Sequence, residues 1–319
     1  MKNLFQYIKR SLIFCLIFLL VLFVYDQTIK WLVREINVED YGVLNKINEG
    51  KINADIIVCG TSRSLKAVNP EIIEQKMGLT CFNISSDGSD LGVQIPKLKW
   101  YLTNNKVPKI IIQDLSFFGG SISKIIFKPF KYLPYLDNES LYHGLLSIDQ
   151  NLWKNKYFFP ANLLYYNFDF GVDLVTGLLK SFLGKEIYIK GFFPDNSKWT
   201  INVDEYLSKN QEFKCRITSE FKKYLNELIN ICIKNDIKLV LVSLPIFYKI
   251  TENAIGEKEI AQYYHSLEKN NQNIFFFDYN SSSICRDTTN FYNFSHMNLC
   301  GAKKLSTLLA RDLLTTVPK

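Results

Sequence analysis

One serine near the start of the chain and one histidine near its end have the types and positions that nucleophilic catalysis needs. Ser62 follows an apolar run, Ile56–Cys59, that stops at Gly60. A buried strand ending in a tight turn places its next polar residues at the rim of an open α/β sheet, where such folds bind ligands. His296 lies in the segment Asn293–Asn298, just before a helix-like C-terminus. A hydroxyl and an imidazole can act as nucleophile and general base from distant positions, because such sites are defined by geometry.

The serine segment also has a simpler interpretation. Gly-Thr-Ser is a common polar turn, and a serine after a strand is usually a helix cap. The chain has only three histidines, and His143 and His265 lie in segments with no other chemical signature. We expect both to be surface or helix-packing residues, which leaves His296 as the partner of Ser62.

Apolar strands and helices alternate along much of the chain. Five strands are predicted, at about residues 56–59, 80–84, 109–114, 238–242 and 273–277. Helices are predicted at about residues 70–76, 90–100, 219–235 and 299–314. Buried strands that alternate with helices indicate a parallel sheet covered on both faces. We therefore expect residues 51–319 to form one α/β domain, a three-layer α/β/α sandwich of the flavodoxin-like kind.

Residues 117–212 interrupt this alternation. The region is rich in Phe, Tyr and Trp, with proline turn signals at Pro129, Pro134 and Pro160. It is predicted to be an insertion over the carboxyl edge of the sheet, where loops carry specificity. Its aromatic side chains have three interpretations that the sequence leaves open: a carbohydrate or acyl-chain groove, a surface resting on a membrane, or a small satellite core.

The N-terminus predicts a membrane anchor. Lys9 and Arg10 precede Ser11–Tyr25, a charge-free apolar run that is shorter than the roughly 20 residues of a spanning helix. Flanking residues can lengthen it to about 11–30, since lysine and arginine snorkel and Trp31 can sit at the far interface. Positive charge before the run predicts a cytoplasmic tail at 1–10 and an extracytoplasmic remainder. Residues 31–50, which are charged and helix-prone, are predicted to form a stalk. No small-residue cleavage site follows, so we favour an uncleaved signal anchor, with a cleaved signal peptide as the alternative.

Composition excludes several classes of function. Hydrophobic content of 47% with 22% charged residues is ordinary for a globular protein. The net charge of +7 is spread along the chain without an arginine-rich block, which argues against dedicated nucleic-acid binding. The cysteines lack metal-site spacing and no nucleotide-binding glycine motif follows a strand, so no metal or cofactor is expected. Cys285 and Cys300 bracket the histidine segment, and the sequence leaves open whether they form a disulfide.

Three sequence blocks resemble the SGNH/GDSL hydrolase superfamily. Gly60-Thr61-Ser62-Arg63 looks like the first block, and the resemblance makes Ser62 the nucleophile, with its N–H in the oxyanion hole. The segment from Phe82 to Gly88 looks like the second block, whose glycine, here Gly88, gives a backbone N–H to the oxyanion hole. Asn293–Asn298, followed by Gly301-Ala302, is similar to the last block and makes His296 the general base.

Two departures from the family pattern bear on activity. The family has an aspartate three residues before the histidine, where this chain has Asn293. An amide oxygen can orient the imidazole but lacks the charge that stabilises imidazolium. The third block, which often supplies another oxyanion donor, is replaced by Gln113-Asp114-Leu115-Ser116. Gln113 or Ser116 is expected to donate instead, and Asp278 or Asp287 remains open as a replacement carboxylate.

Neighbouring polar residues have expected supporting roles. Arg63 pairs either with an anionic polymer group or, in the structural role that we favour, with a nearby carboxylate. Asn83 and Asp87 are expected to brace the second loop.

The layout is most similar to membrane-anchored extracytoplasmic members of the superfamily, including the D-alanine-transfer protein of teichoic-acid D-alanylation and the alginate O-acetylation proteins. This resemblance implies an esterase or O-acyltransferase that acts on ester-linked acyl groups of a cell-envelope glycan or polymer, beside a membrane-bound O-acyltransferase. The alternative is a catalytically weak or inactive scaffold that binds polymer or the acyltransferase partner.

Overall fold

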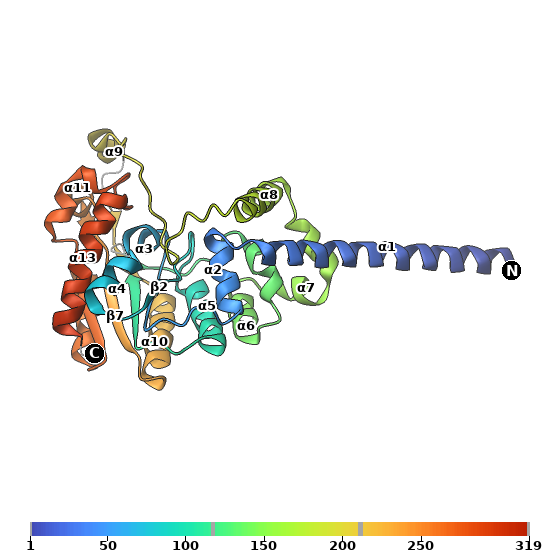
Figure 1. Cartoon of the computed structure of the whole chain (residues 1–319), viewed down its shortest axis with the longest axis horizontal. Coiled ribbons are helices and arrows are strands. Elements are labelled where there is room, and N and C mark those ends of the chain that lie inside the picture. The colour runs from blue at the N-terminus through green and yellow to red at the C-terminus, as the bar shows by residue number, and fades with distance from the viewer. Residues whose placement is uncertain (1, 116–118, 210–212, 318–319) are drawn as a thin grey trace.

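A five-stranded parallel sheet forms the centre of the protein (Figure 1). The computed structural model describes residues 2–115, 119–209 and 213–317. The strand order is β2-β1-β3-β7-β9, and neighbouring strands pair in parallel throughout. The strands are β1 (Ile56–Cys59), β2 (Cys81–Asn83), β3 (Ile110–Leu115), β7 (Lys238–Ser243) and β9 (Ile274–Asp278). All five coincide with predicted strands, because each is a short apolar run bounded by polar or turn residues.

Successive residues of these strands enter two separate cores, one on each face of the sheet. Ile57 and Leu239 pack in the larger core, whereas Ile56 and Val240 pack in the smaller one. This alternation follows from the two-residue period of a strand. Helices α5 and α10 pack together over the larger core, and α4 packs with α13 over the smaller one. The predicted three-layer α/β/α arrangement is therefore confirmed.

The helices of the sheet domain are α2 (Glu39–Asn48), α3 (Ser62–Ala67), α4 (Pro70–Met77), α5 (Leu91–Asn104), α10 (Ser219–Lys234), α11 (Tyr248–Thr251), α12 (Glu257–Lys269) and α13 (Leu299–Thr316), with 3₁₀ turns η3 (Ser283–Arg286) and η4 (Thr288–Asn290). Between β3 and α10 lie η1 (Pro129–Tyr135), α6 (Glu139–Ile148), α7 (Leu152–Tyr157), η2 (Phe159–Leu164), α8 (Phe168–Phe182) and α9 (Val203–Lys209). Short two-residue strands make two further pairs: β4 (Gly119–Gly120) with β6 (Arg216–Ile217), and β5 (Phe213–Lys214) with β8 (Ala254–Ile255).

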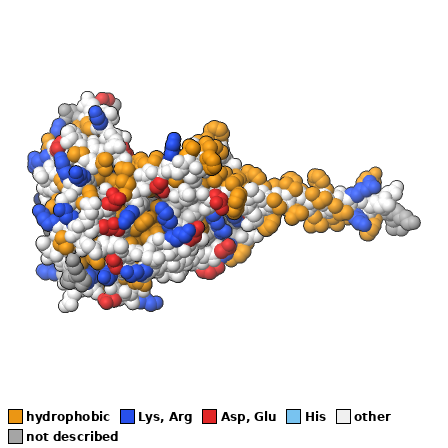
Figure 2. All heavy atoms as spheres, viewed as in Figure 1, with side chains coloured by type: hydrophobic (Ala, Val, Ile, Leu, Met, Phe, Trp, Pro, Cys, Tyr) orange, Lys and Arg blue, Asp and Glu red, His pale blue; other side chains and the backbone are white. Residues whose placement is uncertain are grey.

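Helix α1 (Lys2–Glu35) projects from the sheet domain as a long shaft with an apolar surface (Figures 1 and 2). Within the described residues it is the one helix long and apolar enough to cross a membrane. The predicted anchor at 11–30 lies inside it. Side chains from Leu4 to Tyr25 are largely exposed, which suits contact with lipid rather than with protein.

The predicted stalk at 31–50 is instead part of the folded domain. Helix α1 continues to Glu35, and α2 follows almost at once. Val33, Ile36, Leu44 and Ile47 are each no more than 2% exposed and belong to the larger core. The charged residues between them suggested a solvated segment, but the apolar residues recur at helical spacing and bury one face of each helix.

Much of the insertion is placed differently from the prediction. Its part from residue 129 to 182, here called the cap, packs against α5 and the C-terminal half of α1 rather than over the carboxyl edge of the sheet. Residues 188–199, here called the strap, follow that edge. Two other parts of the insertion also reach it, since Phe127 lies against Gly88 and the Tyr206 ring lies 4.8 Å from that of Phe294. The strap is held by hydrogen bonds from the Asn83 N–H to the Lys190 oxygen (2.9 Å) and from the Leu299 N–H to the Asp195 oxygen (2.7 Å). Residues 117, 118 and 210–212 of the insertion lie outside the described residues.

Candidate active site

The structure brings Ser62 and His296 together. The Ser62 Oγ lies 2.8 Å from the His296 Nε2, although the residues are 234 positions apart. Ser62 follows the carboxyl end of β1, and His296 lies in the loop just before α13. Because neighbouring strands are parallel, the loops at their carboxyl ends share one edge of the sheet, which accounts for the meeting.

The turn after β1 leaves little freedom for Ser62. A Cβ atom on Gly60 would lie 2.2 Å from the Ser64 Oγ and 2.6 Å from the Asp114 Cβ, so only glycine fits there without rearrangement. Thr61 caps α3 by accepting a hydrogen bond from the Arg63 N–H at 3.1 Å. The Thr61 hydroxyl also donates to Asp114 Oδ2 at 2.9 Å. Asp114, which is buried, therefore braces the turn that presents the serine.

Asn293 fixes the orientation of the imidazole. Its Oδ1 lies 3.1 Å from His296 Nδ1 and also accepts the backbone N–H groups of His296 (2.9 Å) and Ser295 (3.0 Å). Two backbone donors on one atom identify that atom as the amide oxygen. Nδ1 therefore carries the proton, and Nε2 has a lone pair free to accept the Ser62 hydroxyl.

No described carboxylate takes the place of the missing aspartate. Asp287 caps η4 through the Thr289 N–H at 2.9 Å, and Asp278 accepts the Asn280 N–H at 3.0 Å. Neither has a hydrogen bond to His296 among the described residues. The remaining neighbour of Nδ1 is the Ser295 hydroxyl, at 3.2 Å.

Positive charge surrounds the imidazole. The pKa of His296 is lowered to about 4, first by burial and then by Lys66 and Arg63, while Asp195 opposes the shift. Lys66 Nζ lies 3.1 Å from Asp195 Oδ2 and 2.8 Å from the Tyr292 hydroxyl. The Tyr292 ring stacks on the His296 ring at 5.5 Å. The imidazole is therefore neutral near neutral pH, and an imidazolium formed there has little stabilisation.

Lys66, Tyr292 and Asp195 were not recognised in the sequence. Lys66 lies four residues after Ser62 on a short helix, a spacing that puts both side chains on one face and could have indicated it. Asp195 had no local signal, because it reaches the site through the strap from a distant part of the chain.

The backbone N–H groups of Ser62 and Gly88 remain the candidate oxyanion donors. Among the described residues, neither amide donates a hydrogen bond to a recorded acceptor. Gly88 is exposed and has φ +62°, a conformation that favours glycine. Its loop is tied to the serine turn, because the Ser86 N–H and the Ser89 hydroxyl both donate to the Gly60 oxygen, at 3.2 and 3.0 Å.

The other predicted donor is already occupied. Gln113 Nε2 donates to Gln94 Oε1 at 2.7 Å and to the Asp114 oxygen at 2.9 Å, and the side chain is buried. Since an amide nitrogen has two hydrogens, Gln113 has none left for an oxyanion. The expectation that it donates to the site is therefore wrong. Ser116, the alternative donor, lies outside the described residues.

Asn83 and Arg63 hold the loops in place. Asn83 Nδ2 donates to the oxygens of Ser64 (2.9 Å) and Val68 (3.1 Å), while its Oδ1 accepts the Ser85 N–H at 2.9 Å. It therefore connects α3 to the loop after β2. Arg63 donates to the oxygens of Ser295 (3.3 Å) and Leu244 (2.6 Å). Its role among these contacts is structural, but its described partners are backbone carbonyls rather than the carboxylate that was expected.

Asp87 makes no described hydrogen bond that would brace its loop. It instead borders a charged hollow with Asp40, Lys131 and Tyr188. Burial raises the pKa of its carboxyl above the ordinary value, and nearby Asp40 raises it further.

The cysteines and remaining histidines make no recorded hydrogen bond with Ser62 or His296 among the described residues. Cys285 and Cys300 are both free, so the disulfide left open by the sequence is not formed. Burial raises the pKa of the Cys285 thiol to about 11. His143 and His265 are exposed and lie beside Glu139 and Glu268. In the described part of the chain, no group of three or more His, Cys, Asp or Glu residues is arranged to hold a metal ion.

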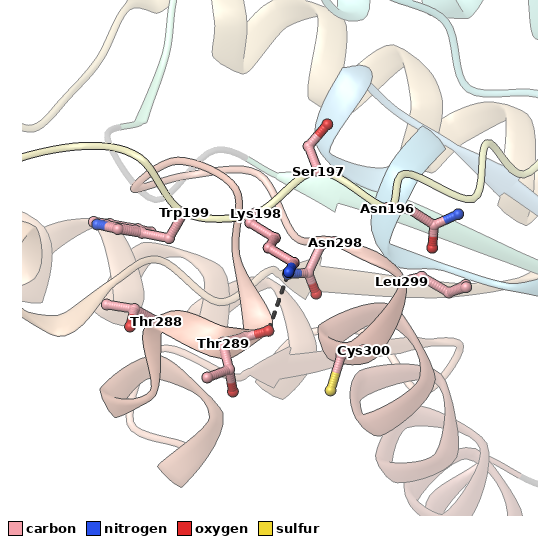
Figure 3. Close-up of a pocket in the computed structure, with 9 residues that line it drawn as sticks. All are labelled: Asn196, Ser197, Lys198, Trp199, Thr288, Thr289, Asn298, Leu299 and Cys300. Atoms are coloured by element: carbon pink, nitrogen blue, oxygen red, sulfur yellow. Dashed lines mark hydrogen bonds between the residues drawn. The ribbon is translucent and has the colours of Figure 1, made fainter.

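A hollow of about 500 Å³ opens beside the histidine loop, between the strap and the start of α13 (Figure 3). It is lined by Asn196, Ser197, Lys198, Trp199, Thr288, Thr289, Asn298, Leu299 and Cys300. Its wall is stabilised by Asn298 Nδ2, which donates to the Thr289 oxygen at 2.9 Å. Ser62 and His296 are not part of the lining, although Asn298 is only two residues from the imidazole. The hollow is therefore separate from the Ser62–His296 pair, and Asn298 links its wall to the histidine loop through the chain.

Comparison with known proteins gives little guidance. No protein-family model matches the sequence, and no curated protein matches it. A solved structure described provisionally as a platelet activating factor from Streptococcus pneumonia has a TM-score of 0.42 and 12% sequence identity, over 89% of this chain and 94% of that chain. At that distance, any assignment of function depends on the geometry of the site itself.

Proposed function

We propose that this chain is a membrane-anchored, extracytoplasmic esterase or O-acyltransferase of the SGNH type. Its substrates would be ester-linked acyl groups on a cell-envelope glycan or polymer. The observation that carries the proposal is the chain of contacts from Ser62 Oγ to His296 Nε2 (2.8 Å) and from His296 Nδ1 to Asn293 Oδ1 (3.1 Å). This is the arrangement of nucleophile, base and orienting group that acyl transfer requires.

In the proposed reaction, Ser62 Oγ attacks the ester carbonyl while His296 Nε2 takes its proton. The N–H groups of Ser62 and Gly88 stabilise the oxyanion, and the leaving alcohol receives the proton as the ester C–O bond breaks. Water or a sugar hydroxyl then attacks the acyl-serine, with His296 again acting as base. The hollow beside Trp199 offers an aromatic face with hydroxyl and amide groups, and we place the polymer there (Figure 3).

A serine-directed fluorophosphonate tests the proposal. The full-length chain in detergent is expected to label, and Ser62→Ala is expected to abolish labelling. Ser62 Oγ lies 2.8 Å from Nε2, the nitrogen of His296 that is free to accept a proton, whereas the Ser295 hydroxyl lies beside the protonated Nδ1. Ser121→Ala, which changes an exposed serine, is the matched control and should label normally. Labelling that persists in Ser62→Ala would place the nucleophile elsewhere.

The second candidate is a scaffold of the same fold that binds polymer or a membrane-bound O-acyltransferase, the partner class that the resemblance suggests. The observation in its favour is the amide of Asn293 in a site where Lys66 and Arg63 oppose imidazolium. A properly folded chain that does not react with the fluorophosphonate would favour the scaffold.

The low pKa of His296 predicts an unusual pH profile for kcat/KM. An ordinary histidine base loses activity below about pH 6.5, whereas here the loss is expected only below about pH 4. The sign follows from the lowered pKa, since the neutral, active form persists to more acidic pH. Lys66→Met removes one of the charges and should move the acid limb to higher pH. A wild-type limb at pH 6.5 would contradict the prediction, measured as hydrolysis of a small acyl ester.

A further inference from the structure

The charge-free part of α1 is too short to cross a bilayer unaided. Ser11–Tyr25 has 15 residues, which as a helix spans about 22 Å against a hydrocarbon core of about 30 Å. If Arg10 marks the inner interface, about 20 residues bring the outer boundary near Lys30 and Trp31. Trp31 is 58% exposed, as an interfacial tryptophan would be. Residues 23–30 of α1 would then lie at the depth of the outer leaflet.

A charged residue at that depth is enclosed by the cap. Asp26 is fully buried, and its carboxylate accepts hydrogen bonds from Asn162 Nδ2 (2.8 Å) and the Tyr166 hydroxyl (2.7 Å). Lys30 Nζ pairs with it at 2.9 Å. A charge at bilayer depth is expensive unless it is paired and shielded from lipid. The cap provides this shielding, which requires the cap itself to reach the same depth.

Ring contacts fix the depth of the cap along α1. The Phe159 ring lies 5.4 Å from that of Phe23, and the Tyr166 ring lies 6.1 Å from that of Tyr25. Phe159 and Tyr166 are therefore level with the last residues of the charge-free run.

Near these ring contacts in the sequence, the cap has large apolar side chains that are exposed on its surface. They are Tyr157, Phe158, Leu164 and Phe168, which are 69%, 56%, 82% and 83% exposed and are here called the collar. In water, so many exposed aromatic and leucine side chains on adjacent segments would be unfavourable. Aromatic side chains are, however, enriched where proteins meet the membrane interface.

We infer that the collar inserts into the outer leaflet of the membrane, so that α1 and the cap anchor the protein together. The occupant of this surface is lipid. Acyl chains would contact the collar on its side toward the bilayer centre, and headgroups would contact it on the side toward the sheet domain. The insertion completes the apolar span that α1 lacks and accounts for the burial of Asp26. It does not depend on the esterase chemistry proposed above.

Helix α8 supplies an internal control for depth. It begins at the collar with Phe168, but its last turn lies farther out, since the Asn37 N–H donates to Ser181 Oγ at 3.0 Å. Phe182, at 88%, is as exposed as Phe168. In Figure 1, α8 is seen partly end-on whereas α1 lies in the plane of the view. The two helix axes are therefore inclined to each other rather than parallel. Apolar side chains of this region form a patch where α1 leaves the domain (Figure 2).

Tryptophan fluorescence in pure phosphatidylcholine vesicles with acyl-chain bromines tests the inference. The full-length chain is reconstituted with single added tryptophans, and the native tryptophans give a common background. Phe18→Trp, in the exposed part of α1, is expected to lose most of its added emission and thereby verifies insertion of the anchor. Leu164→Trp and Phe168→Trp are expected to lose most of theirs as well, whereas Phe182→Trp keeps most of it.

The outcomes separate the alternatives. Quenching of Phe18→Trp without quenching at positions 164 and 168 would overturn the collar and leave the anchor intact, as expected if a partner protein covers this surface instead. Equal quenching at 168 and 182 would lay α8 flat on the bilayer and overturn the assigned depth. No quenching at position 18 would remove the spanning helix and the collar together.

Discussion

Replacing His296 by glutamine is expected to lower turnover by roughly 10³- to 10⁵-fold. A complete serine triad loses about 10⁶ when its general base is removed, but here Asn293 already leaves the site without the triad charge. Ser62 Oγ would keep a polar neighbour, but glutamine cannot take the proton that the hydroxyl must give up at 2.8 Å. The measurement is the single-turnover rate on a small acyl ester, with the full-length chain in detergent.

The chain offers matched controls for this substitution. His143→Gln and His265→Gln change exposed histidines that lie beside glutamates away from the site, and both should leave the rate unchanged. A His296→Gln variant that retains wild-type folding and a rate within about tenfold of the wild type would refute the assignment of His296 as base.

Asn293→Asp is expected to accelerate the reaction. A carboxylate at this position would still accept from Nδ1 and the two backbone N–H groups, and its charge would oppose the effect of Lys66 and Arg63 on the imidazolium. The reverse change in a serine triad costs about 10⁴, part of it through the wrong tautomer. Because Asn293 already selects the correct tautomer, we expect a smaller gain, roughly 10- to 10³-fold.

The same substitution should raise the pKa of His296 and move the acid limb of kcat/KM above about pH 4. Asn293→Ala is the control and should slow the reaction by removing the orienting acceptor. If Asn293→Asp changes neither the rate nor the acid limb, the charge deficit at the imidazole is not what limits this site.

The central sheet could be predicted because its signal is local. Each strand is a buried apolar run, and burial on both faces removes the polar alternation that would make a strand ambiguous with a loop. Ser62 and His296 were found for a related reason, since one follows a strand and the other precedes the last helix. Their contact was then implied by the parallel topology.

The parts that escaped prediction depend on long-range contacts. Residues 31–50 carry enough charge to suggest a stalk, and only packing against the cap and α5 explains their burial. Asp195 reaches Lys66 from the strap, and the two Gln113 hydrogens are taken by neighbours that no spacing rule indicates. The cap contacts α1 and α5 instead of the sheet edge. Its position depends on the packing of apolar surfaces that lie far apart in the sequence, which a local pattern does not reveal.

The continuity of α1 from its exposed half into the larger core limits how the protein can work. Ile29, Val33 and Ile36 of the α1 region are buried in the larger core. Helix α1 is therefore attached rigidly to the globular part, which cannot rotate freely about it. If α1 spans a membrane as proposed, this stiff helix fixes the height of the globular part above the bilayer. Under the proposed function, the protein would then meet immobile polymer chains by lateral diffusion in two dimensions, and esters beyond that height would stay untouched.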